Sequence, residues 1–308
     1  MSGKYRTISL FSGCGGLDMG FLGGFESHGR IYDCLPFKII WANDINEVAC
    51  ETYRRNIGAE IHCGDIWKLM QTLPRRADVV IGGFPCQDVS INGRGAGEEG
   101  RRTTLYRAML EVVRRLQPRV FVAENVKGLL LERHAAFREK ILADFTGLGY
   151  KVSHHLYLAA DYGVPQMRER VFIAGTRGRT KPFRPPTPPL IQSKWLTAKD
   201  AIKDLESLPE DRERNHIWSK AKRNTEQGSR TLQADRPAAT IRAECHGNIQ
   251  FHYCLTRRLS MREAMRFQSF PDVFTFACGI RQMERQIGNA VPPVLGWHIA
   301  HAVRECLL

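Results

Sequence analysis

The sequence predicts an α/β fold in which helices cover both faces of a doubly wound, parallel sheet. Residues 5–175 alternate short apolar segments with helix-like segments, and this alternation is typical of βαβ units. The predicted strands are residues 7–11, 37–43, 78–82, 120–124 and 171–174. Helical periodicity in segments such as 46–56 and 106–116 indicates the covering helices.

Length and composition indicate a protein of about two domains with a large core. The chain has 308 residues, and 45 Lys and Arg against 32 Asp and Glu give a net charge of +13. This charge favours a polyanionic partner such as nucleic acid, although a merely basic surface would give the same count. No membrane segment or signal peptide is expected, because no apolar run approaches the required length.

The nine cysteines are odd in number and include no CxxC pair. This pattern argues against a disulfide framework and against a structural zinc site, so no metal is expected. A reducing cytoplasm is the predicted compartment, and any one cysteine could be a free thiol.

A proline cluster marks the predicted domain boundary. Five of the fifteen prolines fall in residues 181–190, and proline-dense segments form extended spacers. Between Arg214 and Arg242, seven Lys or Arg stand against two Asp or Glu, a ratio compatible with a solvated surface and with a DNA-facing module. Helical character returns with a predicted Ser260 N-cap and Glu263 three residues later, and residues 291–303 predict a last helix. We therefore expect one domain of residues 1–180 and 258–308, with 181–257 inserted.

Glycines follow the first predicted strand, in FSGCGGLDMGF at residues 11–21. Gly13, Gly15 and Gly16 allow a tight turn and a close approach of the backbone to a ligand. The spacing differs from GxGxxG, which disfavours a nicotinamide dinucleotide but leaves a methyl-donor site and a plain turn open.

Acidic residues follow the next two strands. WANDIN places Asp44 where a carboxylate accepts from ribose hydroxyls and Ile45 where it covers an adenine, and HCGDIW places Asp65 within reach of an adenine amino group. Ligands of doubly wound sheets bind beyond the carboxyl ends of the strands. The order of these features predicts an adenosine-containing cofactor, although each aspartate alone is also a common helix N-cap.

Cys86 follows the strand at 78–82, between Pro85 and the polar pair Gln87 and Asp88. Most cysteines with a structural role are buried within apolar elements. This one lies in a glycine-rich loop that could close over a substrate, and this position favours a nucleophile.

Polar residues also follow the later strands. Glu124 and Asn125 end the strand at 120–124, and QMRER carries Gln166, Arg168 and Arg170 at alternate positions. Alternate residues of a strand share a face, so we expect these three side chains to project together. Two adjacent arginines need anionic or carbonyl partners, which DNA phosphate and cytosine O2 would supply.

These residue types suit methylation of cytosine at C5. Addition of a thiolate to C6 makes C5 nucleophilic, and it places negative charge on N3 and O2. A protonated Glu124 at N3 and an arginine at O2 would stabilise that charge. A neutral glutamate implies a pKa raised by desolvation or by contact with the bound base.

The motifs FSGCGGLDMGF, PCQ, ENV, QMRER and GNAVPP occur here in the order found in the cytosine-5 DNA methyltransferases of bacterial restriction-modification systems. RRLSMREAMRFQSFPD also resembles a block of that family, and the resemblance covers about residues 5–175 and 256–303. It implies a Rossmann-like methyltransferase sheet with a small inserted target recognition domain. It further implies methyl transfer from S-adenosylmethionine, which becomes S-adenosylhomocysteine, to a cytosine flipped out of double-stranded DNA.

The resemblance implies roles for individual residues. Cys86 would be the nucleophile, Glu124 its partner at N3 and Arg170 a contact of the cytosine, with Arg168 in support. The expected cofactor-binding residues are Phe11, Gly13, Gly15, Gly16, Leu17, Asp44, Ile45, Asp65, Ile66, Pro85, Asn289 and Ala290. The predicted DNA-binding residues are Gln87, Ser90, Arg94, Gln166, Lys220, Lys222, Arg223, Arg230 and Arg242.

Three other functions were weighed against this one. A branch of the same family methylates transfer RNA, but FPCQDVS favours DNA. A non-catalytic DNA-binding module would have lost Cys86, Glu124 or the arginine pair, and an oxidoreductase would carry GxGxxG. Small size and the lack of a regulatory domain suggest a bacterial cytoplasmic enzyme that protects host DNA from a cognate restriction endonuclease. A monomer is expected, because one recognition domain can grip the site from one side. One departure from the family pattern, an extra residue in GEEGRRTTLYR, concerns loop closure rather than the chemistry.

Overall fold

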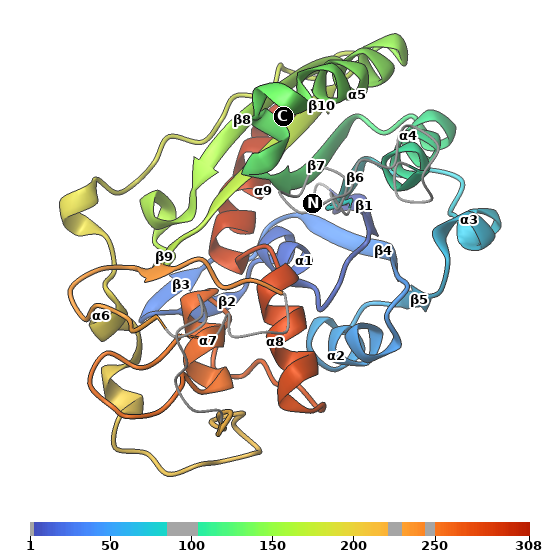
Figure 1. The fold of residues 1–308 in the computed structure, drawn as a ribbon. Helices are drawn as coiled ribbons and strands as arrows, with labels where there is room; N and C mark the ends of the chain where they lie inside the picture. Colours follow the sequence, from blue (N-terminus) through green and yellow to red (C-terminus); the bar gives the residue numbers. More distant parts are fainter. Residues whose placement is uncertain (1–2, 85–103, 221–229, 244–249) are drawn as a thin grey trace.

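The computed structural model describes residues 3–84, 104–220, 230–243 and 250–308. Its centre is a seven-stranded sheet in the order β5-β4-β1-β6-β7-β10-β8 (Figure 1). The strands are β1 (Tyr5–Leu10), β4 (Phe37–Asp44), β5 (Ile61–Cys63), β6 (Val79–Gly82), β7 (Val120–Val126), β8 (Lys151–Leu158) and β10 (Glu169–Thr176). All five strands predicted from the sequence are present, and the α/β doubly wound architecture is confirmed.

The sheet is only partly parallel, which corrects the expectation of a fully parallel one. The strands from β5 to β7 are parallel, whereas β10 runs antiparallel to both β7 and β8. Strand β8 was not predicted, because His154 and His155 interrupt its apolar pattern. Antiparallel pairing allows β10 to follow β8 after a short connection, whereas parallel strands need a long crossover.

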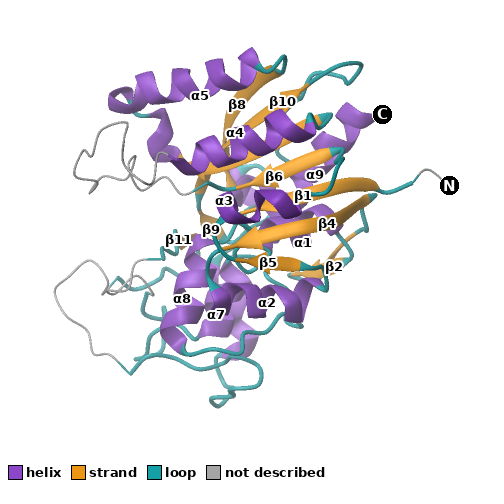
Figure 2. Ribbon diagram, turned by 90° about the vertical axis from the view of Figure 1, so that its right-hand side faces the viewer, coloured by secondary structure: helices purple, strands orange, loops and turns teal. Residues whose placement is uncertain are grey.

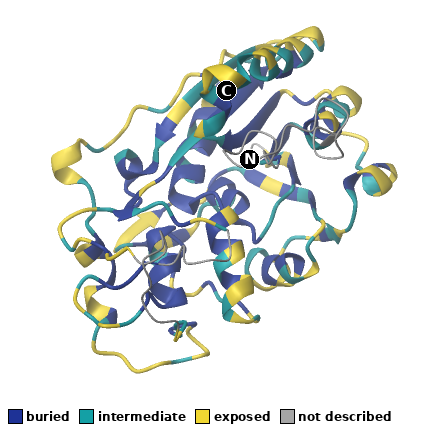
Figure 3. Cartoon of the chain, viewed as in Figure 1, coloured by how far each residue is buried: buried dark blue, intermediate teal, exposed yellow. Residues whose placement is uncertain are grey.

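Helices cover both faces of this sheet, as the alternation of buried strand residues requires. On one face Ile39, Val79 and Val122 pack with helices α1 (Gly16–Leu22), α2 (Glu47–Ile57) and α9 (Pro293–Leu307). On the other face Ile8, Val80 and Phe121 pack with α3 (Ile66–Leu69), α4 (Thr104–Leu116) and α5 (Ala135–Gly147). Figure 3 shows the central strands β1, β6, β7 and β10 mostly buried between these layers, whereas the edge strand β8 is largely half-buried or exposed.

Local signals explain where several helices begin. Asn46 is the N-cap of α2, and its side chain accepts a hydrogen bond from the backbone N–H of Ala49. Helix α7 (Met261–Phe267) begins at the predicted Ser260 N-cap with a complete capping box to Glu263. The predicted last helix is α9, which begins at Pro293, a residue favoured in the first turn.

A second hydrophobic core lies below the sheet, around α6 (Ala198–Ile202), α7 and α8 (Ile280–Asn289) (Figure 2). It includes Leu232 and Ile241 from the predicted insertion together with Met265 and Ile287 from the predicted catalytic domain. The expected boundary at residues 257 and 258 therefore does not divide the cores. A two-residue strand, β11 (Ala238–Ala239), pairs with β9 (Gln166–Met167), and a hairpin of β2 (Phe25–Ser27) and β3 (Arg30–Tyr32) completes the fold.

The proline cluster at 181–190 is an extended segment that follows the sheet unit. Lys181 donates to the Cys306 carbonyl oxygen, Tyr162 donates to that of Pro186, and Leu190 donates to that of Asp161. The chain therefore leaves the sheet unit only after residue 190. Among the residues that the structure describes, no helix is long and apolar enough to cross a membrane.

The contact between α1 and α9 generates a stability prediction. A Cβ built on Gly20 would lie 2.6 Å from the Pro293 carbonyl oxygen and from the Gly296 carbonyl carbon. Gly20→Ala should therefore force the two helices apart and lower the free energy of unfolding by about 1–3 kcal/mol or more, measured by urea denaturation. Gly147→Ala is the matched control, because nothing lies within 4 Å of that position. Equal stabilities of the two variants would contradict this packing.

Candidate active site

The predicted site residues gather at the carboxyl ends of the parallel strands. Phe11 follows β1, Asp44 ends β4, Asp65 follows β5 and Glu124 lies near the end of β7. The junction of α8 and α9 meets the same edge from the other side, because a Cβ on Gly16 would lie 2.3 Å from the Val291 carbonyl oxygen. A doubly wound sheet binds its ligands at this edge.

The turn after β1 uses its glycines in two ways. Gly13 and Gly15 have positive φ angles of 54° and 92°, a region that favours glycine. The space beside Gly15 and Gly16 is filled by protein, since added Cβ atoms would meet Ile57 and Val291. Only Gly13 is open, with nothing within 4 Å of an added Cβ. The expected close approach to a ligand is therefore possible at Gly13, whereas Gly15 and Gly16 serve internal packing.

The Asp44 carboxylate stabilises the turn after β1 by hydrogen bonds. One carboxylate oxygen accepts from the Gly13 backbone N–H and the other from the Asn46 backbone N–H, both at 2.8 Å. Burial raises the pKa of Asp44, and these hydrogen bonds oppose that rise. Each oxygen keeps capacity for a further donor. The neighbouring Ile45 side chain is 75% exposed, which leaves an apolar surface beside the carboxylate.

The other expected cofactor residues differ in how exposed they are and in what they contact. Asp65 is the N-cap of α3 and accepts from the Trp67 backbone N–H at 3.0 Å, so the N-cap alternative is confirmed for it. Leu17 and Ile66 are buried in the two sheet cores, which leaves only their backbone groups for a ligand. Ala290 lies against Gly16, and Asn289 is exposed next to it.

Glu124 and Arg170 form an ion pair at the predicted catalytic position. Arg170 Nε lies 2.8 Å from Glu124 Oε1, and the two side chains are 13% and 12% exposed. Antiparallel pairing of β7 with β10 brings them together from residues 46 positions apart. Burial lowers the pKa of Arg170, and the Glu124 carboxylate opposes this.

The segment that leads to Cys86 begins beside this pair. A Cβ on Gly83 would lie 2.8 Å from Glu124 Oε2, so a larger residue at position 83 would require the Glu124 carboxylate to shift. Asn125 donates from Nδ2 to the Phe84 carbonyl oxygen at 3.3 Å. Cys86 itself lies outside the described residues, as do Pro85, Gln87, Ser90, Arg94, Lys222 and Arg223.

Gln166 and Arg168 do not project with Arg170, which corrects the sequence interpretation. The strand is interrupted at Arg168 between β9 and β10, and both Gln166 and Arg168 are fully buried. Arg168 donates to the carbonyl oxygens of Ile241, Gly288 and Ala290 at 2.9–3.0 Å. Gln166 is likewise held by backbone and side-chain groups of the second core. Neither side chain has surface to offer to DNA in this structure.

The recognition region contains a cavity of about 640 Å³ lined by aromatic and basic side chains. Trp218 lies beneath both Lys220 and Arg257, at 4.6 and 4.3 Å from the ring centroid. Lys220 also pairs with Glu210 at 2.8 Å. Arg230 and Arg242 are exposed. Trp218 and Arg257 were not predicted as site residues, because no local motif marks them.

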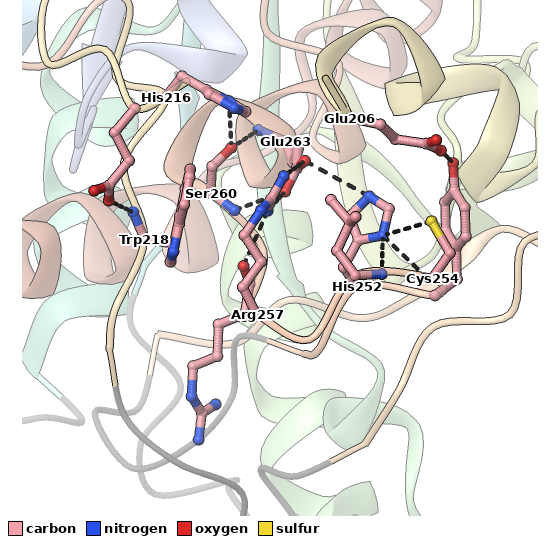
Figure 4. A network of polar contacts seen from close by, with 12 residues as sticks. Glu206, His216, Trp218, His252, Cys254, Arg257, Ser260 and Glu263 are labelled. Carbon is pink, nitrogen blue, oxygen red and sulfur yellow. Dashed lines mark hydrogen bonds and ion pairs between the residues drawn. The ribbon is translucent and has the colours of Figure 1, made fainter. Parts of the chain in front are cut away.

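A buried carboxylate supports the wall of this cavity (Figure 4). Glu263 accepts from both terminal nitrogens of Arg257 at 2.8 Å and from the Ser260 backbone N–H. His252 Nε2 lies 3.7 Å from Glu263 Oε1, while His252 Nδ1 accepts from the backbone N–H groups of Cys254 and Leu255. Glu206 and Cys254 lie near that nitrogen, but its electron pair is already used by the backbone, so this cluster carries no metal assignment.

Asp18 is a buried carboxylate that sequence analysis missed within the glycine motif. It accepts from Ser9 Oγ at 3.0 Å and from the Tyr53 hydroxyl at 2.8 Å, and it thereby joins β1, α1 and α2 beneath the glycine turn. Burial raises its pKa to about 6, although both hydrogen bonds lower it.

This raised pKa predicts a pH-dependent stability. The folded protein holds the Asp18 proton up to about pH 6, whereas the unfolded chain releases it near pH 4, so the free energy of unfolding falls as pH rises through this window. Asp18→Asn removes this titration. Relative to wild type, the variant should gain on the order of 3 kcal/mol between pH 4 and pH 7, measured by urea unfolding at both values. A stability difference independent of pH would contradict the assignment.

Comparisons with known proteins agree with this geometry. The family model for C-5 cytosine-specific DNA methylase matches residues 5–236 and 219–305. The type II methyltransferase M.NgoFVII of Neisseria gonorrhoeae is 37% identical, over 95% of this chain and 84% of that protein. M.BbvI of Brevibacillus brevis is 34% identical, over 94% and 88%.

Solved structures share the fold. The S. pombe Dnmt2 methyltransferase has a TM-score of 0.71 at 17% identity, covering 98% of this chain and 99% of that chain. A prophage-encoded protein of E. coli, described as a DNA modification methyltransferase, has a TM-score of 0.76 at 23% identity and covers 99% of both chains. The family match over nearly the whole length, together with relatives at 34–37% identity, shows that this chain belongs to the C-5 cytosine-specific DNA methylases.

Proposed function

We propose that this chain is a site-specific DNA (cytosine-5)-methyltransferase that uses S-adenosylmethionine. The observation that carries the proposal is the buried Glu124–Arg170 ion pair beside Gly83, three residues before Cys86. A carboxyl group and a guanidinium at this spacing suit the N3 and O2 edge of a cytosine, and the nearby cysteine suits its C6.

The residues at the ends of β1 and β4 fit an adenosyl group. Asp44 keeps acceptor capacity for two ribose hydroxyls, the exposed Ile45 offers an apolar surface to the adenine, and the open side of Gly13 leaves room for the ligand. When bound, S-adenosylmethionine supplies the methyl group, and S-adenosylhomocysteine remains.

The chain's own residues prepare the cytosine. The Cys86 sulfur forms a bond to C6, and the electron pair of the C5–C6 double bond becomes available at C5. Glu124 holds a proton at N3 while Arg170 donates to O2, so the charge that develops on the ring is shared between two groups that already touch. After methylation a base removes the C5 proton, and the Cys86 thiolate leaves as the double bond re-forms.

The substrate that we propose is double-stranded DNA with the target base flipped out, because Cys86 and the methyl donor must reach the ring away from the base stack. The net charge of +13 supports a polyanionic substrate, and Lys220, Arg230 and Arg242 offer exposed cations in the recognition region. The names of the type II relatives support a role in protecting cytoplasmic host DNA from a cognate restriction endonuclease, with no direct contact between the two enzymes. We propose that the enzyme acts as a monomer.

A covalent trap tests the reaction. The protein is mixed with S-adenosylmethionine and duplex DNA of random sequence that carries 5-fluorocytosine, and the products are run on a denaturing gel. Fluorine cannot leave C5 as a proton does, so the Cys86–C6 bond should persist as a shifted band. Cys86→Ala should bind DNA but give no band. A wild-type protein that binds the cofactor yet traps transfer RNA rather than DNA would overturn the choice of substrate.

Glu124→Gln tests the role at N3. The amide keeps the size of the side chain but cannot protonate N3, so single-turnover methylation should slow by about 10²–10⁴-fold. Binding of S-adenosylhomocysteine, measured by calorimetry, should stay within a factor of about three. Methylation at the wild-type rate would exclude Glu124 as the proton donor.

A further inference from the structure

Three buried polar side chains meet between the sheet and the second core: Gln166, Arg168 and Gln268, which we call the polar junction. All three are completely buried. Gln166 begins β9, Arg168 is the one-residue break between β9 and β10, and Gln268 follows α7. Their partners come from segments 73 to 122 residues away from Gln166 and Arg168.

Arg168 is the centre of the polar junction. A buried guanidinium stays charged, and it needs partners to offset the loss of water. It donates hydrogen bonds to backbone carbonyl oxygens: Nη1 donates to Ile241, and Nη2 donates to Gly288 and Ala290. The two terminal nitrogens of the planar guanidinium therefore join two segments that are far apart in the chain. The single ammonium group of a lysine cannot make this set of hydrogen bonds.

The two glutamines complete the junction. Gln166 accepts from the Ile241 backbone N–H at 3.0 Å and donates to Gln268 Oε1 at 2.8 Å. Gln268 in turn donates to the carbonyl oxygens of Ile287 and Ala290. Ile241 is thus held at both its N–H and its C=O, and the end of α8 is held at three carbonyl groups.

The segments that the polar junction holds lie next to residues of the proposed reaction site. Arg170, two residues after Arg168, is the partner of Glu124. Ala290 lies against Gly16 of the turn proposed to bind the cofactor, and Arg242 follows Ile241 in the recognition region. A Cβ on Gly288 would lie 2.3 Å from the Arg242 carbonyl carbon, so the end of α8 and the recognition segment also touch directly.

We propose that Arg168, supported by Gln166 and Gln268, is a positioning residue. It holds the recognition segment at Ile241 and the end of α8 in a fixed position relative to the Glu124–Arg170 pair. Its kinetic consequence rests on the function proposed above. Arg168 contacts neither DNA nor the reacting base: it acts through the backbone groups that it holds.

Arg168→Lys and Gln268→Met test this role, with Arg262→Lys as the matched control. Arg262 is also a buried arginine of the second core that donates to carbonyl oxygens, those of Arg214 and Phe274. Hydrogen–deuterium exchange of peptides that cover residues 238–243 and 286–291 should speed up at least tenfold in both test variants and stay unchanged in Arg262→Lys. This measurement needs no enzymatic activity, so its result stands even if the proposed reaction is wrong.

Kinetics supply the second readout. In the test variants kcat should fall by about 10–100-fold, because displacement of a catalytic group by about 1 Å can reduce a rate 10²-fold. KM for DNA should change less than threefold, and Arg262→Lys should keep the wild-type kcat below its unfolding temperature. If Arg168→Lys does not fold, Gln268→Met carries the test. Wild-type exchange and kcat in folded test variants, or equal effects in the Arg262 control, would overturn the positioning role.

Discussion

Close backbone contact between the glycine turn and the α8–α9 junction is the constraint on which the rest of this structure depends. Gly16 and Gly20 lie so close to residues 291–296 that no side chain fits between the two segments. This contact brings the end of the chain to its first strand. It also places the end of α8 at the same sheet edge as Asp44 and Glu124, so the turn proposed to bind the cofactor and the proposed catalytic pair share one border.

Three buried charged or titratable side chains of this structure are each held by several hydrogen-bond partners. Arg168 has three carbonyl partners, Asp18 has two hydroxyl donors, and Glu263 has Arg257 and a backbone N–H. A buried charge without such partners would be strongly destabilising. Several hydrogen bonds to one buried group fix its position as well as stabilise it, and fixed positions are what a site that must align three groups requires.

Cations of this protein lie in two different environments. Within the sheet unit, Arg170 is paired with Glu124 at the position where we propose that negative charge develops on the cytosine. In the recognition region, Lys220, Arg230 and Arg242 remain exposed, where they can meet a polyanion without a large desolvation penalty. The aromatic ring of Trp218 contacts Lys220 and one further cation there, Arg257.

Five of the seven strands of the sheet, the capping box at Ser260 and the position of Glu124 at a strand end could be predicted from the sequence. These features depend on periodicity and on contacts a few residues apart, which a linear pattern records. Tertiary structure alone decided that Arg168 turns inward while Arg170 faces Glu124, and that Ile241 shares a core with α7 and α8. Those outcomes depend on partners 20 or more residues away, and a break of one residue between β9 and β10 was enough to reverse a face that strict alternation had predicted.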